Sequence, residues 1–253
     1  MSNFLMITIH YAKRAFRDVT DVLILLGIPL GLIVVWGLIN EAAMTPCGYN
    51  AVSSNLAPAF ILSFQFFSGG TMMLLLYKDL RTDMRWRLGA APCSLKTFLV
   101  PAFFANWIFS LAQGVVLVGI TALFLNVYWG NLLVLALVLL LVSLIAILIF
   151  ALVFIFVPKY STANALIYAI SFGMMTLSGF MFFGLHEFLT NYGTPLALGT
   201  RAIVASGMMS DISILYGVIE RGIEQSWINI GILAGIALVL ATVAGIAAKG
   251  KNV

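Results

Sequence analysis

Charged residues are scarce in this sequence. Of its 253 residues, 9% are Asp, Glu, Lys or Arg, whereas 62% are hydrophobic, and the mean hydropathy is +1.11. An ordinary soluble domain carries about 25% charged residues, so a soluble fold could not cover its surface with so few charges. The high apolar content also excludes a disordered chain. The composition therefore indicates a protein whose solvent is lipid.

Catalytic and metal-binding motifs are missing as well. The sequence contains no Walker A phosphate loop, no H-E-x-x-H and no G-x-S-x-G. Its two histidines, His10 and His186, are expected at opposite membrane faces, and so are its two cysteines, Cys47 and Cys93, which excludes a disulfide within the chain. We predict no catalytic residue, no metal site and no ATP hydrolysis by this chain. Its basic residues lie between apolar segments rather than on one soluble face, which argues against nucleic-acid binding.

Six apolar stretches are long enough to cross a membrane as helices, which takes about 20 residues. None of them contains Asp, Glu, Lys or Arg, and they cover residues 22–39, 57–77, 98–125, 132–157, 162–184 and 227–248. Backbone polar groups in lipid must bond internally, which a helix achieves within one segment. The sequence therefore predicts an all-α integral membrane protein, with one transmembrane domain over residues 1–253 and six transmembrane helices.

The distribution of basic residues predicts the orientation. If the N-terminus is cytoplasmic, then of the 13 Lys and Arg only Arg201 and Arg221 fall on the outer side. Loops rich in Lys and Arg stay in the cytoplasm. We expect a multi-pass protein of a bacterial plasma membrane, with both termini in the cytoplasm.

Two further segments are too polar or too short to cross. Residues 1–21 mix apolar side chains with Lys13, Arg14 and Arg17, as in an amphipathic helix that lies in the headgroup layer, although a simple topology-setting charge cluster is an alternative. Residues 185–226 form an outer segment, in which 188–198 and 212–219 could be re-entrant helices if protein covers their ends. The alternative is an ordinary outer loop with one surface helix.

Residues 78–96 form the only sizeable loop predicted in the cytoplasm. Leu80, Met84 and Leu88 recur every four residues, so a helix there has one apolar face. Gly89 and Pro92 then end that helix. A short charged helix with an apolar stripe is suited to docking on a soluble partner. A solvated basic loop without a partner is the alternative.

Neutral polar residues occur inside the predicted spans. Such residues usually form hydrogen bonds between helices, but as a set they also permit a path for a hydrophobic or amphipathic cargo. The candidate path residues are Gln65, Asn106, Gln113, Asn164 and Thr176. Two G-x-x-x-G matches, at 27–31 and 231–235, predict close packing either inside the bundle or between subunits.

The order of these parts resembles the ABC-2 type permease family, the membrane subunits of ABC exporters. The resemblance covers nearly the whole chain, and the nearest local match is Arg-Trp-Arg-Leu-Gly-Ala-Ala-Pro-Cys-Ser at 85–94, which is similar to the family's basic helix followed by a small residue, Pro and Ser. Residues 82–84 are Thr-Asp-Met where the family often has Gly-Thr or Gly-Ser. Thr194-Pro195, with Arg201 six residues after the Pro, is similar to a Pro-containing segment before the family's last span.

The resemblance implies a permease that exports a hydrophobic or amphipathic cargo, such as a drug, an antimicrobial or toxin-like peptide, a lipid or a lipid-linked molecule. A separate ATPase dimer would bind ATP and Mg²⁺, and a second permease subunit, identical or paralogous, would complete the path. By the same resemblance the coupling helix that docks on the ATPase carries Lys78, Asp79, Arg81, Asp83, Arg85, Trp86, Arg87 and Leu88. The alternatives are a stand-alone secondary carrier, a channel or scaffold without an ATPase partner, or a membrane enzyme that uses His186 or Glu187.

Overall fold

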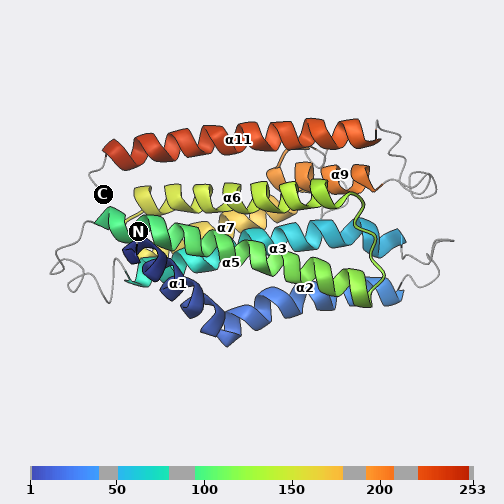
Figure 1. Cartoon of the computed structure of the whole chain (residues 1–253), viewed down its shortest axis with the longest axis horizontal. Helices are drawn as coiled ribbons and strands as arrows, with labels where there is room; N and C mark the ends of the chain where they lie inside the picture. The colour runs from blue at the N-terminus through green and yellow to red at the C-terminus, as the bar shows by residue number, and fades with distance from the viewer. Residues whose placement is uncertain (1, 40–50, 80–94, 179–191, 208–221, 251–253) are drawn as a thin grey trace.

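The computed structural model describes residues 2–39, 51–79, 95–178, 192–207 and 222–250, and every element in these ranges is a helix. The helices are α1 (Ser2–Arg17), α2 (Val19–Ile39), α3 (Ala51–Tyr77), α5 (Leu95–Phe124), α6 (Leu132–Phe156), α7 (Tyr160–Leu177), α9 (Pro195–Ser206) and α11 (Gly222–Gly250). Figure 1 shows the long helices side by side along one direction, with the start of α1 and the end of α11 at the same end of the bundle. The prediction of an all-helical protein is confirmed for this part of the chain.

Four helices are long and apolar enough to cross a membrane. They contain Leu56–Tyr77, Leu99–Phe124, Leu132–Phe156 and Gly222–Lys249, and α1 with α2 forms a fifth candidate if this bent pair counts as one span. These candidates coincide with five of the six predicted stretches. The sixth, 162–184, overlaps α7, which ends at Leu177 and begins with polar residues that lower its hydropathy. Six spans therefore stay a prediction.

Helix α3 lies at the centre of the bundle and contacts α2, α5, α6, α7 and α9. Its middle, residues 63–70, is rich in small and polar side chains, which allow helices to approach closely in lipid. A Cβ on Gly70 would lie 2.6 Å from Cγ2 of Ile167 on α7, and a Cβ on Gly69 would lie 3.3 Å from Cβ of Ala146 on α6. The crossing of α3 and α7 therefore requires glycine at position 70.

Helix α9 is too short to cross a membrane, and it packs between α3, α6 and α11 at the end opposite the start of α1 (Figure 1). Its first turn is capped by Thr194, whose hydroxyl accepts a hydrogen bond from the Ala197 amide at 3.1 Å. Pro195 follows in the first turn, where a backbone N–H has no partner within the helix, so proline loses no hydrogen bond there. The helix thus begins at Pro195 and covers only the last part of the predicted 188–198 segment. Residues 188–191 and 212–219 lie outside the described part of the chain.

Helix α11 begins earlier than predicted and forms one edge of the bundle. Gly222 starts it with a φ of +53°, so residues 222–226, expected in the outer segment, are helical. The Ser226 hydroxyl donates to the Ala202 carbonyl of α9 at 2.8 Å. The helix packs on α6 and α9, and only 17% of its most apolar stretch is buried within the chain. Most of α11 is therefore available to lipid.

Helices α1 and α2 meet at an angle of 59°. Helix α1 packs against α5, where the rings of Phe16 and Phe109 lie 4.9 Å apart in an edge-to-face contact. Thr8 is buried, whereas Lys13 is exposed, so the helix has two different faces. A helix is thus found where the amphipathic segment 1–21 was predicted, and its position in the headgroup layer stays a prediction.

Candidate functional site

An ion pair joins α1 to the residues that follow α3, where the predicted docking loop begins. Asp79, the last described residue before 80–94, accepts an ion-paired hydrogen bond from Arg14 of α1 at 2.5 Å. Tyr11, one turn before Arg14 on the same face of α1, lies near the Asp79 carboxylate. Asp79 is 5% exposed, and a buried carboxylate is stable only with such partners. Helix α1 is therefore tied to the base of segment 78–96.

Tyr77 and Lys78, the two residues before Asp79, contact the end of α6 and the start of α7. The Tyr77 hydroxyl lies 3.0 Å from the Val153 carbonyl and 2.5 Å from the Val157 carbonyl, and it donates its one proton to these groups at the end of α6. The last carbonyls of a helix have no partner within the helix, so this contact fixes where α6 ends. The Lys78 amine lies 5.9 Å from the centre of the Tyr160 ring at the start of α7. The base of the loop thus contacts α1, α6 and α7.

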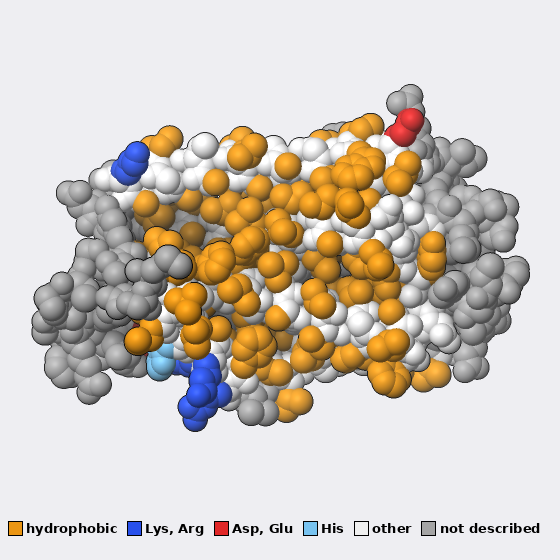
Figure 2. Space-filling model, viewed as in Figure 1, with side chains coloured by type: hydrophobic (Ala, Val, Ile, Leu, Met, Phe, Trp, Pro, Cys, Tyr) orange, Lys and Arg blue, Asp and Glu red, His pale blue; other side chains and the backbone are white. Residues whose placement is uncertain are grey.

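The bundle carries its basic residues mainly at this end. We call the end that holds Lys78, Lys159 and Lys249 the basic end. In Figure 2 the visible Lys and Arg side chains lie toward this end, and the visible acidic side chain lies toward the other. The exposed Glu224 starts α11 at that opposite end. This arrangement agrees with the charge asymmetry of the sequence.

Only the first two predicted docking residues are in the described part of the chain. Lys78 is exposed, whereas Asp79 is buried and engaged with Arg14, so Asp79 is an anchor of the loop rather than a contact surface. The other six residues, at 81, 83 and 85–88, lie outside the described ranges. Docking of segment 78–96 on an ATPase stays a prediction.

Three of the five candidate path residues join helices. Gln65 Nε2 donates to the Leu139 carbonyl of α6 at 3.0 Å, and Asn106 Nδ2 donates to the Gly69 carbonyl at 3.3 Å. Gln113 Nε2 donates to the Leu25 carbonyl of α2 at 2.9 Å. All three side chains are buried. Their amide donors are thus used to hold α2, α3, α5 and α6 together, which is the usual role of such residues in lipid.

The five residues line no common cavity among those formed by the described residues. The side-chain oxygens of Gln65, Asn106 and Gln113 have no hydrogen-bond partner among the described residues. Gln113 lines a cleft of about 90 Å³ beside α1 and α2. Asn164 and Thr176 are both half-buried on α7 and line neither this cleft nor the larger groove described next.

The larger groove lies between α2, α3 and α7 and encloses about 380 Å³. This volume is within the range of small-molecule sites, about 300–1,000 Å³. Its walls are mostly apolar, with three phenylalanines and three polar side chains among the lining residues: Phe64, Phe67, Phe172, Asp21, Thr71 and Tyr168. The rings of Phe67 and Phe172 meet edge to face at 5.0 Å across the α3–α7 contact. We call this site the α2–α3–α7 groove.

Sequence reasoning missed this groove, although a signal was present. Phe64, Phe67 and Thr71 recur at helical spacing on one face of α3, and Tyr168 and Phe172 do so on α7. Spacing assigns residues to a face but does not tell which two faces meet. Asp21, the last residue of the predicted amphipathic segment 1–21, follows the bend between α1 and α2 and lines the groove.

No protein-family model matches the chain, and no curated protein matches it significantly. The class of protein therefore follows from the fold alone. A bundle with four or five helices that can each cross a membrane, an apolar surface and charges near its ends is an all-helical membrane protein.

Proposed function

We propose that this chain is the transmembrane permease subunit of an ATP-driven exporter of the ABC-2 type. The observation that carries the proposal is the Arg14–Asp79 contact, because it joins the N-terminal helix to the base of the loop predicted to dock on an ATPase. A force applied to segment 78–96 would pass through Asp79 to α1 and through Tyr77 to the end of α6. This is the connection that a permease driven by a separate motor needs.

The same proposal places the basic end in the cytoplasm of the plasma membrane. Lys78, Lys159 and Lys249 lie there, as the rule on positively charged cytoplasmic loops requires. The docking helix then faces the compartment that holds ATP. Both termini are cytoplasmic in this arrangement, and the ATPase dimer supplies the site for ATP and Mg²⁺.

The α2–α3–α7 groove supports a hydrophobic or amphipathic cargo. Its phenylalanines offer apolar contact, whereas Asp21, Thr71 and Tyr168 offer a few polar contacts. Ile24 and Ile28 are exposed along its rim, so a molecule dissolved in the bilayer reaches the groove sideways. Rigid-body movement of α2 relative to α7 would widen or narrow it.

A second permease subunit has an available surface on α2. A Cβ on Gly27 or Gly31 would meet no atom within 4 Å, so this G-x-x-x-G pair makes no close packing contact among the described residues. The same holds for Gly231 and Gly235 on α11. Of the two interpretations of these motifs, contact between subunits is therefore the one we propose.

A reconstituted complex tests the proposed motor connection. We expect no ATP hydrolysis from the purified chain alone, and hydrolysis that responds to cargo when the chain is co-expressed with its ABC ATPase, sought among the neighbouring reading frames. Charge reversal in the docking helix, Arg81→Glu with Arg85→Glu, should abolish co-purification of that ATPase. Glu224→Lys is the control, since it reverses an exposed charge at the opposite end. An intact complex after the double reversal would refute the docking assignment and favour a carrier or scaffold without an ATPase.

The cargo groove has its own test. Ile28→Trp places a large ring at the rim of the α2–α3–α7 groove, and Ile232→Trp is the matched control, because Ile28 is 46% exposed and Ile232 is 43% exposed. Export of a fluorescent amphiphile should fall in the first variant and stay at the wild-type level in the second. Equal export by both variants would remove the groove from the transport path.

A further inference from the structure

A second groove lies at the basic end, between α5, α6 and α11. Helix α11 packs on α6 rather than on α5, and the space left between them encloses about 270 Å³. Leu99, Val100 and Phe103 of α5 form one wall, and Phe154 of α6 contributes to the floor. Lys249 contributes to the other wall from the end of α11. We call this the α5–α6–α11 groove.

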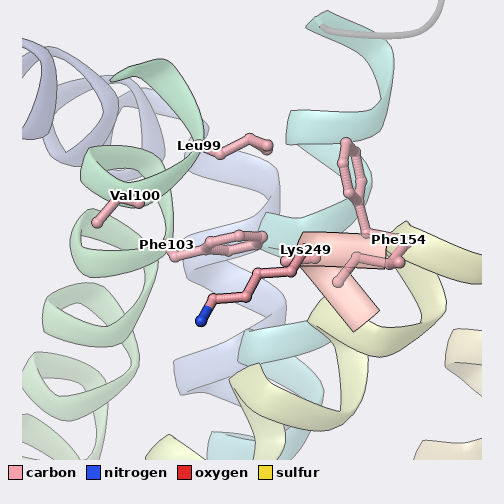
Figure 3. A pocket seen from close by; sticks show the side chains of 7 residues that line it. Leu99, Val100, Phe103, Phe154 and Lys249 are labelled. Carbon is pink, nitrogen blue, oxygen red and sulfur yellow. The ribbon is translucent and has the colours of Figure 1, made fainter. Parts of the chain in front are cut away.

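The groove combines an apolar interior with one cation. Figure 3 shows the Lys249 side chain extended past the Phe103 ring, with its amine at the edge of the labelled side chains. Lys249 is exposed, and no acidic side chain among the described residues forms an ion pair with it. The methylene groups of a lysine can cover apolar surface while the amine stays in a polar layer. An occupant must therefore be apolar along most of its length and negative at one end.

The size and position of the groove narrow the choice of occupant. Its volume is below the usual range for a drug-sized ligand, about 300–1,000 Å³, but it admits part of a single hydrocarbon chain. Val100 is 57% exposed on its wall, and Ile246 is 72% exposed one turn before Lys249, so the groove adjoins surface that faces lipid. Lys249 ends the apolar stretch of α11, and a lysine at the end of a transmembrane helix reaches the headgroup layer.

We propose that the α5–α6–α11 groove binds an anionic phospholipid of the leaflet that meets the basic end. One acyl chain lies along Phe103 and Phe154, and the Lys249 amine contacts the headgroup phosphate. A lipid held there fills the space between α5 and α11, two helices that pack on α6 but make little contact with each other. The inference depends only on the membrane class of the protein, so it stands apart from the proposed export function.

Native mass spectrometry of the full chain tests this site. The protein is mixed with equal amounts of phosphatidylglycerol and phosphatidylcholine that carry the same acyl chains, and the retained lipids are counted. We expect the wild type to prefer phosphatidylglycerol, and Lys249→Gln to lower that preference about fivefold, the factor expected for one lysine at an anionic surface. Lys249→Arg should keep the preference. Lys159→Gln is the control, because it removes an exposed charge at the same end and outside the groove lining.

A second pair of measurements separates the contribution of the acyl chain to lipid binding from that of the headgroup. Val100→Gln makes the exposed groove wall polar without touching the buried core, so both lipids should be retained less while the melting temperature is preserved. Glycerophosphoglycerol, the headgroup without acyl chains, should not displace the lipid. The proposal is overturned if Lys249→Gln matches the wild type, if Lys159→Gln loses as much preference, or if the free headgroup competes as well as the whole lipid. None of these measurements contains an ATPase, so they fail or succeed independently of the export proposal.

Discussion

Removing Arg14 should destabilise the protein more than neutralising Asp79, although both changes break the same ion pair. The Asp79 side chain is 7% exposed, whereas that of Arg14 is 42% exposed. In Arg14→Gln a carboxylate stays buried beside Tyr11 without its cation. In Asp79→Asn no charge is buried, and the Arg14 guanidinium remains in contact with water.

The expected sizes follow from these exposures. Removing one partner of a fully buried pair costs about 3–5 kcal/mol, whereas exposed pairs contribute about 0.2–1 kcal/mol. Because one partner is buried and the other is not, we expect Arg14→Gln to lower the free energy of unfolding by about 2 kcal/mol. Asp79→Asn should lower it by about 0.5–1 kcal/mol, since the amide oxygen still accepts a hydrogen bond. The double variant should resemble Asp79→Asn, because no unpaired carboxylate is left.

Reversible denaturant unfolding in mixed micelles measures all three variants against the wild type. The double-mutant cycle gives the coupling between the two side chains directly. Equal costs for the two single variants, or a larger cost for Asp79→Asn, would refute the reasoning from burial. A coupling near zero would show that the contact does not fasten α1 to the end of α3.

Two further predictions concern the packing of α3. Gly70→Ala should destabilise the bundle, by about 1–3 kcal/mol for overpacking, because its Cβ would lie 2.6 Å from Ile167; Gly119→Ala, with open space around it, should show no loss in the same unfolding assay. A loss in Gly119→Ala as large as in Gly70→Ala would contradict the close approach of α3 and α7. Tyr77→Phe keeps the ring but removes the hydroxyl from the Val157 carbonyl, so it should cost about 1 kcal/mol and speed hydrogen exchange at the end of α6; unchanged exchange there would argue against this anchor.

The sequence was sufficient to place most of the long apolar helices. The absence of charge from five of the predicted stretches, and the polar breaks between them, correspond to helices that can cross a membrane. Helix starts were harder to predict. Pro195 starts α9 within the predicted segment 188–198, because proline begins a helix more readily than it continues one, and Gly222 starts α11 five residues before the predicted span.

Neither the two grooves nor the Arg14–Asp79 ion pair could be predicted from the sequence, and the physical reason is the same for all three. The pair Arg14–Asp79 joins residues that are 65 positions apart, and nothing local to either one specifies the other. Asp79 in particular reads as one of several charges in a basic loop, and only the crossing of α1 over the end of α3 buries it. Hydrophobic periodicity told which faces are apolar, but in lipid an apolar face packs against a helix or against acyl chains equally well.

The peripheral place of α11 bears on how the protein is assembled. The other seven described helices can pack on one another before α11 arrives, because α11 packs mainly on α6 and α9. The hydrogen bond from the Ser226 hydroxyl to the Ala202 carbonyl then fixes the position of α11 along α9. Because α11 follows the other described helices along the chain, the surface of α6 and α9 on which it packs is synthesised before it.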